Sequence, residues 1–320
     1  NNATTPSSET DRRAFSFDVL PSSLIDNMMI YKSPSAELPA DFSGGFVRVM
    51  TKNIPDGNTF NVSCQMGFNT NATFRNFQLT DGTAKDYLGF GAGVRNLPSS
   101  FPAHLGEHST DEAAAFTRQI NQRWGINKFT AIPDQKISLT SHRSYDVGGW
   151  KIGNITNLNW STEYDYSETV HNNYIAYDVK NDVSRPRFEY NDIRYKNTSK
   201  LGALFNWSFQ RDGSKYELRN FFSQRGVSAL TQREGMNYYS DKNIRKWESL
   251  YTGRTTYSGQ ISGVHTLREN VNKVDWTAGY ACASYCEPDR KIVNSILDEN
   301  RTEQPNYYVS DPMRYYQELK

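Results

Sequence analysis

The chain has 320 residues, of which 36 are Lys or Arg and 35 are Asp or Glu, so its formal net charge is +1. This balance excludes the strongly basic surface that is typical of nucleic-acid-binding proteins. No run of about 18 apolar residues occurs, which excludes a helical membrane protein. Aromatic residues make up 13% of the chain, which disfavours disorder and, with few aliphatic residues, fits all-β architectures.

The first part of the chain mixes helix and strand signals. Ser22–Asp26 resembles a capped helical turn. Two strand candidates follow, Met28–Lys32 and Phe46–Thr51, and a stretch rich in Pro and Gly separates them. The residues Ile54–Asn58 then form a strong breaker, so a boundary is expected near residue 53.

After residue 58 the pattern changes to long segments in which apolar and polar residues alternate with period two. In one of them Leu201, Ala203 and Phe205 alternate with Lys200 and Asn206. Such alternation predicts strands with one apolar face. The seven predicted strands are 60–68, 136–145, 152–166, 195–210, 216–228, 247–267 and 274–282.

The predicted connections between these strands alternate strictly between short and long. The short ones, with hairpin chemistry, are 146–149, 211–215 and 268–273; the long ones are near 70–131, 168–184, 229–246 and 287–320. Outer-membrane barrels have this asymmetry and carry aromatic girdles. Apolar residues next to the short turns fit such a girdle: Trp150, Phe205, Trp207, Phe209, Leu267 and Trp276. The sequence therefore predicts a mainly β fold, a transmembrane antiparallel up-and-down β-barrel. Since barrels close with an even strand number, seven strands predict part of a longer polypeptide.

A specific resemblance appears near the start of the chain. The residues Phe15–Asp26, Ile30–Gly45 and Val47–Asn53 resemble the end of the plug domain of TonB-dependent outer-membrane receptors, with a Tyr-Lys pair, a Pro/Gly-rich connection, Gly-Gly and a final strand ending in Thr-Lys. The segment Asp86–Gly91, followed by Arg95–Pro98, is similar to the first outer loop of a subgroup of these receptors.

The resemblance implies a domain organisation and a mechanism. Residues 1–53 would be the C-terminal part of the plug, a small α+β remnant, and residues 54–320 the first strands of a 22-stranded barrel. Such receptors bind a scarce nutrient at the surface of a Gram-negative bacterium, and import it through the outer membrane when TonB, driven by its inner-membrane energising complex, displaces the plug. A surface lipoprotein is a further possible partner, in an environment of lipid and lipopolysaccharide.

Two sets of site residues follow from this interpretation. Plug–barrel or gating contacts are expected from Arg12, Arg13, Glu37 and Arg48, since a removable plug needs polar, breakable pairs. Lumen-facing positions are expected at Glu163, Asp165, Lys196, Lys200, Arg254 and Gln260, because charge is tolerated inside a barrel. Ordinary surface charge remains the alternative for the first set, and contact with plug or water for the second.

No arrangement of catalytic residues stands out, so the chain is interpreted as non-enzymatic and without a cofactor. His104 and His108 are four residues apart next to a plausible amphipathic helix at Thr110–Trp124, but only Glu107 could complete a metal site, so two solvated histidines are the preferred interpretation. Two alternatives to a transporter stay open. One is a structural scaffold of the same architecture for surface lipoproteins or secretion, and the other is a soluble β-sandwich that binds carbohydrate.

Overall fold

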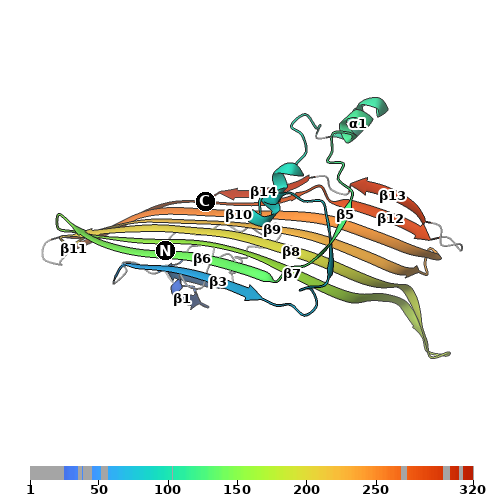
Figure 1. Cartoon of the computed structure of the whole chain (residues 1–320), viewed down its shortest axis with the longest axis horizontal. Helices are drawn as coiled ribbons and strands as arrows, with labels where there is room; N and C mark the ends of the chain where they lie inside the picture. The colour runs from blue at the N-terminus through green and yellow to red at the C-terminus, as the bar shows by residue number, and fades with distance from the viewer. Residues whose placement is uncertain are drawn as a thin grey trace.

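The protein is built mainly of β-strands, and one large antiparallel sheet dominates it (Figure 1). The computed structural model describes residues 25–34, 38, 45–51, 57–102, 104–267, 272–297, 303–309 and 313–319. The sheet begins with neighbouring strands in the order β3 (Thr59–Gly67), β6 (Asp134–Val147), β7 (Trp150–Asp178), β8 (Val183–Arg211), β9 (Ser214–Asn237) and β10 (Lys242–Leu267).

Shorter strands complete the far side of the sheet in two branches, both of which begin at β10. β11 (Asn272–Pro288) and β12 (Lys291–Leu297) both pair with β10, and the extra residue between the Gly253–Cys286 and Ser249–Lys291 pairs makes a bulge. β13 (Glu303–Val309) pairs with β12, and β14 (Met313–Leu319) pairs with β11. In the described part of the chain the sheet is open, with β3 at one edge and β13 and β14 at the other.

All seven predicted strands after residue 58 are present, as β3 and β6 to β11. The short turns at 146–149 and 211–215 are confirmed as tight hairpins. In the second, Asp212 and Gly213 have φ angles of 44° and 76°, the left-handed pair that matches the twist of the flanking strands. The third predicted short turn, 268–273, lies largely outside the described residues.

Three of the four expected long loops were wrong. β7 and β8 continue through most of 168–184, β9 and β10 through most of 229–246, and the segment 287–320 contains β12, β13 and β14. In the β7–β8 extension both faces of β7 are exposed, so side-chain alternation vanishes although the backbone ladder continues to the Asp178–Val183 pair. Only 70–131 is a long excursion from the sheet.

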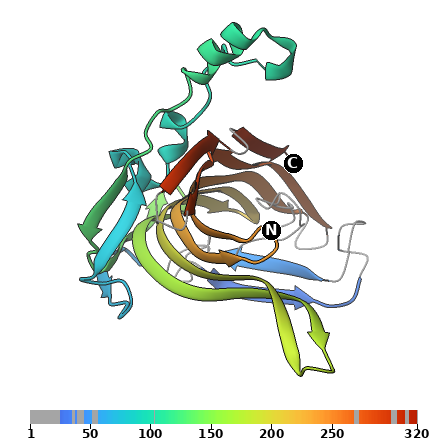
Figure 2. The same ribbon diagram turned by 90° about the vertical axis from the view of Figure 1, so that its right-hand side faces the viewer.

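The two faces of the sheet differ in chemistry, as the period-two pattern predicted. Directly paired residues share a face, and the register places Leu158, Ala203 and Phe222 together on the outer, convex face. Lys200 and Arg254 lie on the inner, concave face. Figure 2 shows the sheet curled, with the hairpin β4 (Asn76–Thr80)–β5 (Ile126–Thr130) on the outer side and the hairpin β1 (Ile25–Tyr31)–β2 (Phe46–Thr51) on the inner side.

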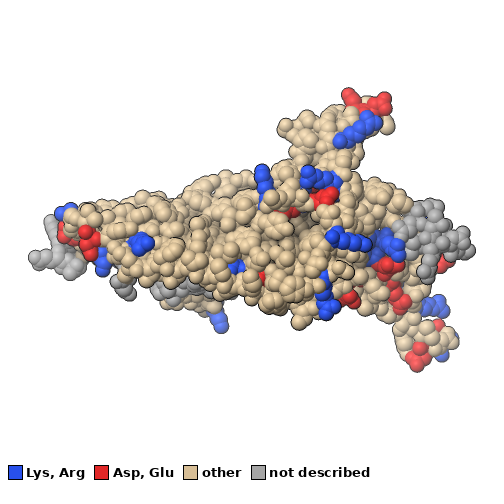
Figure 3. All heavy atoms as spheres, viewed as in Figure 1, with Lys and Arg blue, Asp and Glu red and all other residues tan. Residues whose placement is uncertain are grey.

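The convex face carries a belt without charged side chains across five strands. The belt comprises the even positions of 150–166, 216–232 and 274–286, and the odd positions of 193–209 and 247–263. Figure 3 shows the corresponding middle of the sheet almost free of Lys, Arg, Asp and Glu, with charges gathered towards both ends. Arg143 of β6 is on this face near its short turn. Each strand of the belt exceeds the 9–11 or so residues that cross a bilayer when tilted.

Aromatic side chains border the belt beside the short turns, as the sequence predicted. Trp207 stacks on Phe209 with ring centroids 6.1 Å apart, and Trp150 lies 6.2 Å from Tyr216. Trp276 donates a hydrogen bond from Nε1 to His265 at 3.1 Å. Amphipathic rings in such a row are typical of a membrane–water interface.

The long connection between β3 and β6 folds back over the other end of the convex face. Phe77 of β4 is 1% exposed, and its ring contacts Tyr164 and Tyr195 of the sheet edge-on at 5.3 and 5.2 Å. This cluster, which includes Leu230, is the main apolar core of the described residues. It fastens the β4–β5 hairpin to β7, β8 and β9.

The same connection carries three short 3-10 helices and one α-helix. η3 (Ala84–Leu88) and η4 (Gly91–Val94) form a segment, residues 84–94, that we term the strap because it lies across β8, β9 and β10. Beyond it, η5 (Leu105–Glu107) and α1 (Thr110–Thr117) form an arm that projects from the sheet (Figure 1). α1 is shorter than the predicted Thr110–Trp124 helix. Among the described residues, no helix is both long and apolar enough to cross a membrane.

Candidate functional site: the concave polar face

The structure brings all six predicted lumen-facing residues to the concave face. Their positions follow from the register, in which Asp165 is opposite Lys196, Glu163 is opposite Thr198, and Gln260 is opposite Arg219. Asp165 and Lys196 form an ion pair of 2.8 Å. Lys200 Nζ lies 3.8 Å from Glu163 Oε1, and the Arg254 guanidinium lies 5.5 Å from the centre of the Tyr285 ring.

Four cationic residues lie in one line across this face. The register pairs Lys136 with Ser161, Ser161 with Lys200, Lys200 with Arg225, and Arg225 with Arg254. We call Lys136, Lys200, Arg225 and Arg254 the cation row. Directly opposite residues on neighbouring strands have Cβ atoms about 5 Å apart, a distance at which like charges repel. The row therefore generates a positive potential that attracts anionic groups facing the sheet.

Ion pairs also lie on either side of the cation row. Towards the short turns, Glu217 is held by Lys215 at 2.8 Å and Arg219 at 2.6 Å. Towards the opposite end, Arg233 pairs with Asp192 through two bonds of 2.7 and 2.6 Å. Acidic partners thus accompany the basic residues on both sides of the row, and within the row Lys200 has Glu163 beside it at 3.8 Å.

Sequence reasoning missed two members of the cation row, Lys136 and Arg225. Both lie in the two strands with the weakest alternation, β6 and β9, so neither stood out. Even a correct assignment of their faces would not align them with Lys200 and Arg254, because alignment needs the register between strands. Hairpin turns fix that register, and a one-residue slip would move every side chain to the other face.

Of the plug–barrel candidates, Arg48 alone lies in the described part of the chain. It is on β2 opposite Met29, and its guanidinium lies 5.7 Å from the centre of the Tyr31 ring. Arg12, Arg13 and Glu37 lie outside the described residues, so their role stays a prediction. The position of β1 and β2 on the concave side places Arg48 on the same side of the sheet as the cation row (Figure 2).

The two loop histidines are not arranged as helical metal ligands. His104 precedes η5 and His108 follows it, both in extended conformation. His108 Nδ1 is 3.8 Å from Glu112, and its ring packs against Phe116 at 5.2 Å. Among the described residues, no group of three or more His, Cys, Asp or Glu side chains is placed to hold a metal ion.

Comparison with protein-family models, with curated proteins and with solved structures gave no match to this chain. The two faces of the sheet and the resemblance of the residues before β3 are therefore the features that bear on function. The concave face offers binding and positioning of anionic groups.

Proposed function

We propose that this chain is part of a TonB-dependent outer-membrane receptor of a Gram-negative bacterium, which binds a scarce nutrient at the cell surface and imports it into the periplasm. The observation that carries the proposal is the two-faced sheet, with an uncharged belt bordered by aromatic rings on its convex face and charged residues on its concave face. A sheet with this division suits lipid outside and water or a plug inside.

In this proposal the two open edges of the sheet pair with further strands to close a barrel of 22 strands. Closure satisfies the backbone groups of β3 and of β13 and β14, which would otherwise be unpaired in lipid. Residues 1–53, with β1 and β2, are the C-terminal part of the plug on the concave side. TonB displaces the plug, and a path along the concave face opens to the nutrient.

The cation row gives this path a preference for anionic groups. Lys136, Lys200, Arg225 and Arg254 are contributed by four different strands at one level, so acidic groups of a plug or of a solute are attracted there. The charged side chains belong to rigid strands, which keeps the level of the positive potential fixed while the plug moves.

Conductance of the natural full-length protein in a planar lipid bilayer tests the barrel and the plug together. We expect a low conductance for the intact protein and a large, ohmic conductance after deletion of the whole plug, residues 1–53 included. A soluble β-sandwich gives no channel in either case. A polypeptide mass well above the 36.6 kDa of this chain, measured on detergent-solubilised outer membrane, is also expected.

Uptake separates the transporter from a scaffold of the same architecture. Cells that express the protein should accumulate labelled nutrient only while the proton gradient and TonB are intact, and collapse of the gradient should stop uptake without affecting surface binding. A scaffold for surface lipoproteins would instead co-purify with its partner and leave uptake of every tested nutrient unchanged. In the described residues the second sheet on the uncharged face is the two-stranded β4–β5 hairpin, which covers the end away from the short turns and leaves the rest of the belt open. This partial cover favours the membrane architectures over the sandwich.

A further inference from the structure

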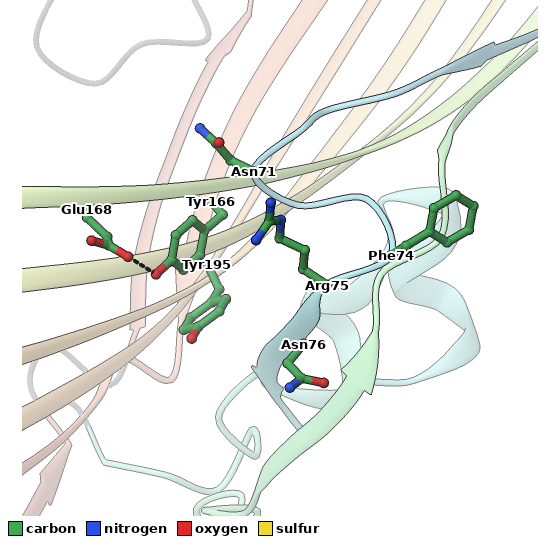
Figure 4. A pocket seen from close by; sticks show the side chains of 7 residues that line it. All are labelled: Asn71, Phe74, Arg75, Asn76, Tyr166, Glu168 and Tyr195. Atoms are coloured by element: carbon green, nitrogen blue, oxygen red, sulfur yellow. Dashed lines mark hydrogen bonds between the residues drawn. The ribbon is translucent and has the colours of Figure 1, made fainter.

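A groove opens on the convex side of the protein, on the face opposite the cation row. It has a volume of about 600 Å³ and lies between the beginning of β4 and the strands β7 and β8 (Figure 4). The loop contributes Asn71 and Arg75, β4 contributes Asn76, and the large sheet contributes Tyr166, Glu168 and Tyr195. This volume is in the range of small-molecule sites.

One wall of the groove is a pair of tyrosine rings that is fixed from behind. The centroids of Tyr166 and Tyr195 are 5.2 Å apart with an interplanar angle of 59°. Tyr195 is 7% exposed, packs on Phe77, and accepts a hydrogen bond of 3.4 Å from Gln78 Nε2. Tyr166 donates from its hydroxyl to Glu168 Oε1. Sugar rings pack their C–H faces on such aromatic walls, and a wall that is already ordered loses little entropy on binding.

The polar groups of the groove include one positioned cation. Arg75 Nε donates to the Thr70 carbonyl at 2.9 Å, which holds the side chain in place. The side-chain hydrogen bonds of Arg75 to the described residues use Nε alone, so its two terminal nitrogens remain donors for a ligand. Figure 4 shows Arg75 directed towards Tyr166 and Asn71. A guanidinium fork binds phosphate in bidentate geometry, and Glu168 can accept hydrogen bonds from sugar hydroxyls.

The turn that carries Arg75 is also preorganised. Asn69 donates from Nδ2 to the Tyr164 carbonyl at 3.2 Å, and its Oδ1 accepts from the Asn71 backbone N–H at 3.0 Å. Next to Arg75, the Phe74 N–H donates a hydrogen bond of 2.8 Å to the Ala131 carbonyl, which holds this part of the turn against the end of β5. Loop and sheet therefore present the groove as one rigid unit.

We propose that this groove binds a sugar that carries a phosphate group. Its place in the fold admits two sources of that chemistry. Glu168 is the first charged residue on the convex face of β7 beyond the uncharged belt, so the groove lies where a glycolipid headgroup would meet the protein. A free sugar phosphate offers the same groups. The lipid source rests on the proposed outer-membrane location, whereas the chemistry of the groove does not.

Titration calorimetry on the natural full-length protein in detergent tests the proposal with three probes: glucose 6-phosphate, glucose, and lipid A in mixed micelles. We expect binding of at least one phosphorylated probe and much weaker binding of glucose. Arg75→Gln should weaken that binding by about tenfold or more, the usual effect of losing a charge-assisted hydrogen bond. Lys128→Gln, which removes an equal charge from an exposed site on β5 of the same hairpin, should leave binding unchanged.

Tyr166→Leu should also weaken binding of the phosphorylated probe, since the substitution removes one of the two rings of the aromatic wall. Preference for lipid A identifies a headgroup as the source, and preference for glucose 6-phosphate identifies a free sugar. The proposal is overturned if no phosphorylated probe binds, if glucose binds equally well, or if Arg75→Gln and Lys128→Gln have equal effects. Arg75-dependent binding without channel conductance would retain the groove and refute the proposed function, and the reverse result would refute the groove alone.

Discussion

The backbone of Gly89 lies directly on Gly226, so close that a Cβ atom on Gly226 would be 2.6 Å from the Gly89 Cα. The Gly89 carbonyl accepts hydrogen bonds from Gln224 Nε2 and, at 2.8 Å, from the Tyr251 hydroxyl. That hydroxyl accepts in turn from the Gly91 N–H at 2.8 Å. Tyr251 is 3% exposed, so these bonds are protected from water, and they dock the strap on the convex face.

Gly226→Ala is therefore expected to lift the strap from the sheet. The new methyl group meets the Gly89 backbone, which cannot move without breaking the bonds to Gln224 and Tyr251. Hydrogen exchange of residues 84–94 should accelerate. Gly253→Ala is the matched control, since Gly253 is directly opposite Gly226 but its Cβ would meet nothing closer than 3.6 Å. Equal exchange in the two variants would contradict this docking.

Phe77→Ala should detach the β4–β5 hairpin from the sheet. The buried ring fills the space between Tyr164 and Tyr195, and its loss should cost about 3–5 kcal/mol of local stability. Phe129 is the residue opposite Phe77 on β5 and is 37% exposed, so Phe129→Ala should cost much less. Hydrogen exchange of β4 and β5 in urea measures both. A larger effect of the Phe129 variant would refute the assignment of Phe77 as the anchor.

The period-two pattern predicted the strands near Leu201 and Ala203 because each strand there separates two different environments. It failed between Val170 and Asp178, where β7 is exposed on both faces and the side chains carry no alternation. There the ladder of backbone hydrogen bonds maintains the strand, and backbone hydrogen bonds produce no pattern of side chains in the sequence. The expected loop at 168–184 was wrong for this reason.

The six lumen candidates could be assigned to one face from the sequence, but the cation row could not. Lys200 and Arg225 are adjacent only because the hairpin at Asp212 and Gly213 sets the register of β8 and β9. The groove at Tyr166 was equally hidden, since Arg75 reaches it only after the connection between β3 and β6 folds back over the sheet. A single sequence does not reveal which distant segments of the chain are in contact.

An arginine in the middle of the convex belt should destabilise the protein in a bilayer. Ala203 lies between Leu158 and Phe222, and Ala203→Arg should cost about 2–4 kcal/mol when unfolding is measured by urea titration in phospholipid vesicles. Ser258→Arg introduces the same side chain on the concave face of β10 and should cost far less. Equal costs would show that the convex face does not meet lipid.

The first turn of α1 should respond to acid. The side-chain hydrogen bond with Ser109, together with one to the Ser109 backbone, lowers the pKa of Glu112 below its usual value. A group with a lowered folded pKa stabilises the fold above its unfolded pKa, and this contribution is lost as the pH falls through the folded pKa. The protection factor of the Ala113 amide, which is its exchange corrected for the intrinsic pH dependence, should therefore fall below about pH 4. Ser109→Ala should raise the Glu112 pKa, seen by carbon NMR, and remove this dependence; an unchanged titration would contradict the capping box.

The cation row should make the opened channel select for anions. With the whole plug deleted, residues 1–53 included, a KCl gradient across a planar bilayer should give a reversal potential shifted towards the equilibrium potential of chloride. The reason is that Lys200, Arg225 and Arg254 concentrate anions at one level of the lumen. Arg225→Gln removes the central charge and should move the reversal potential towards zero, with a larger shift when Arg254→Gln is added. Lys180→Gln, at the exposed tip of the β7–β8 hairpin, alters net charge equally and should have almost no effect, since high salt screens a charge beyond about 10 Å. A cation-selective channel, or equal shifts from Arg225→Gln and Lys180→Gln, would mean that the row does not line the path of the ions.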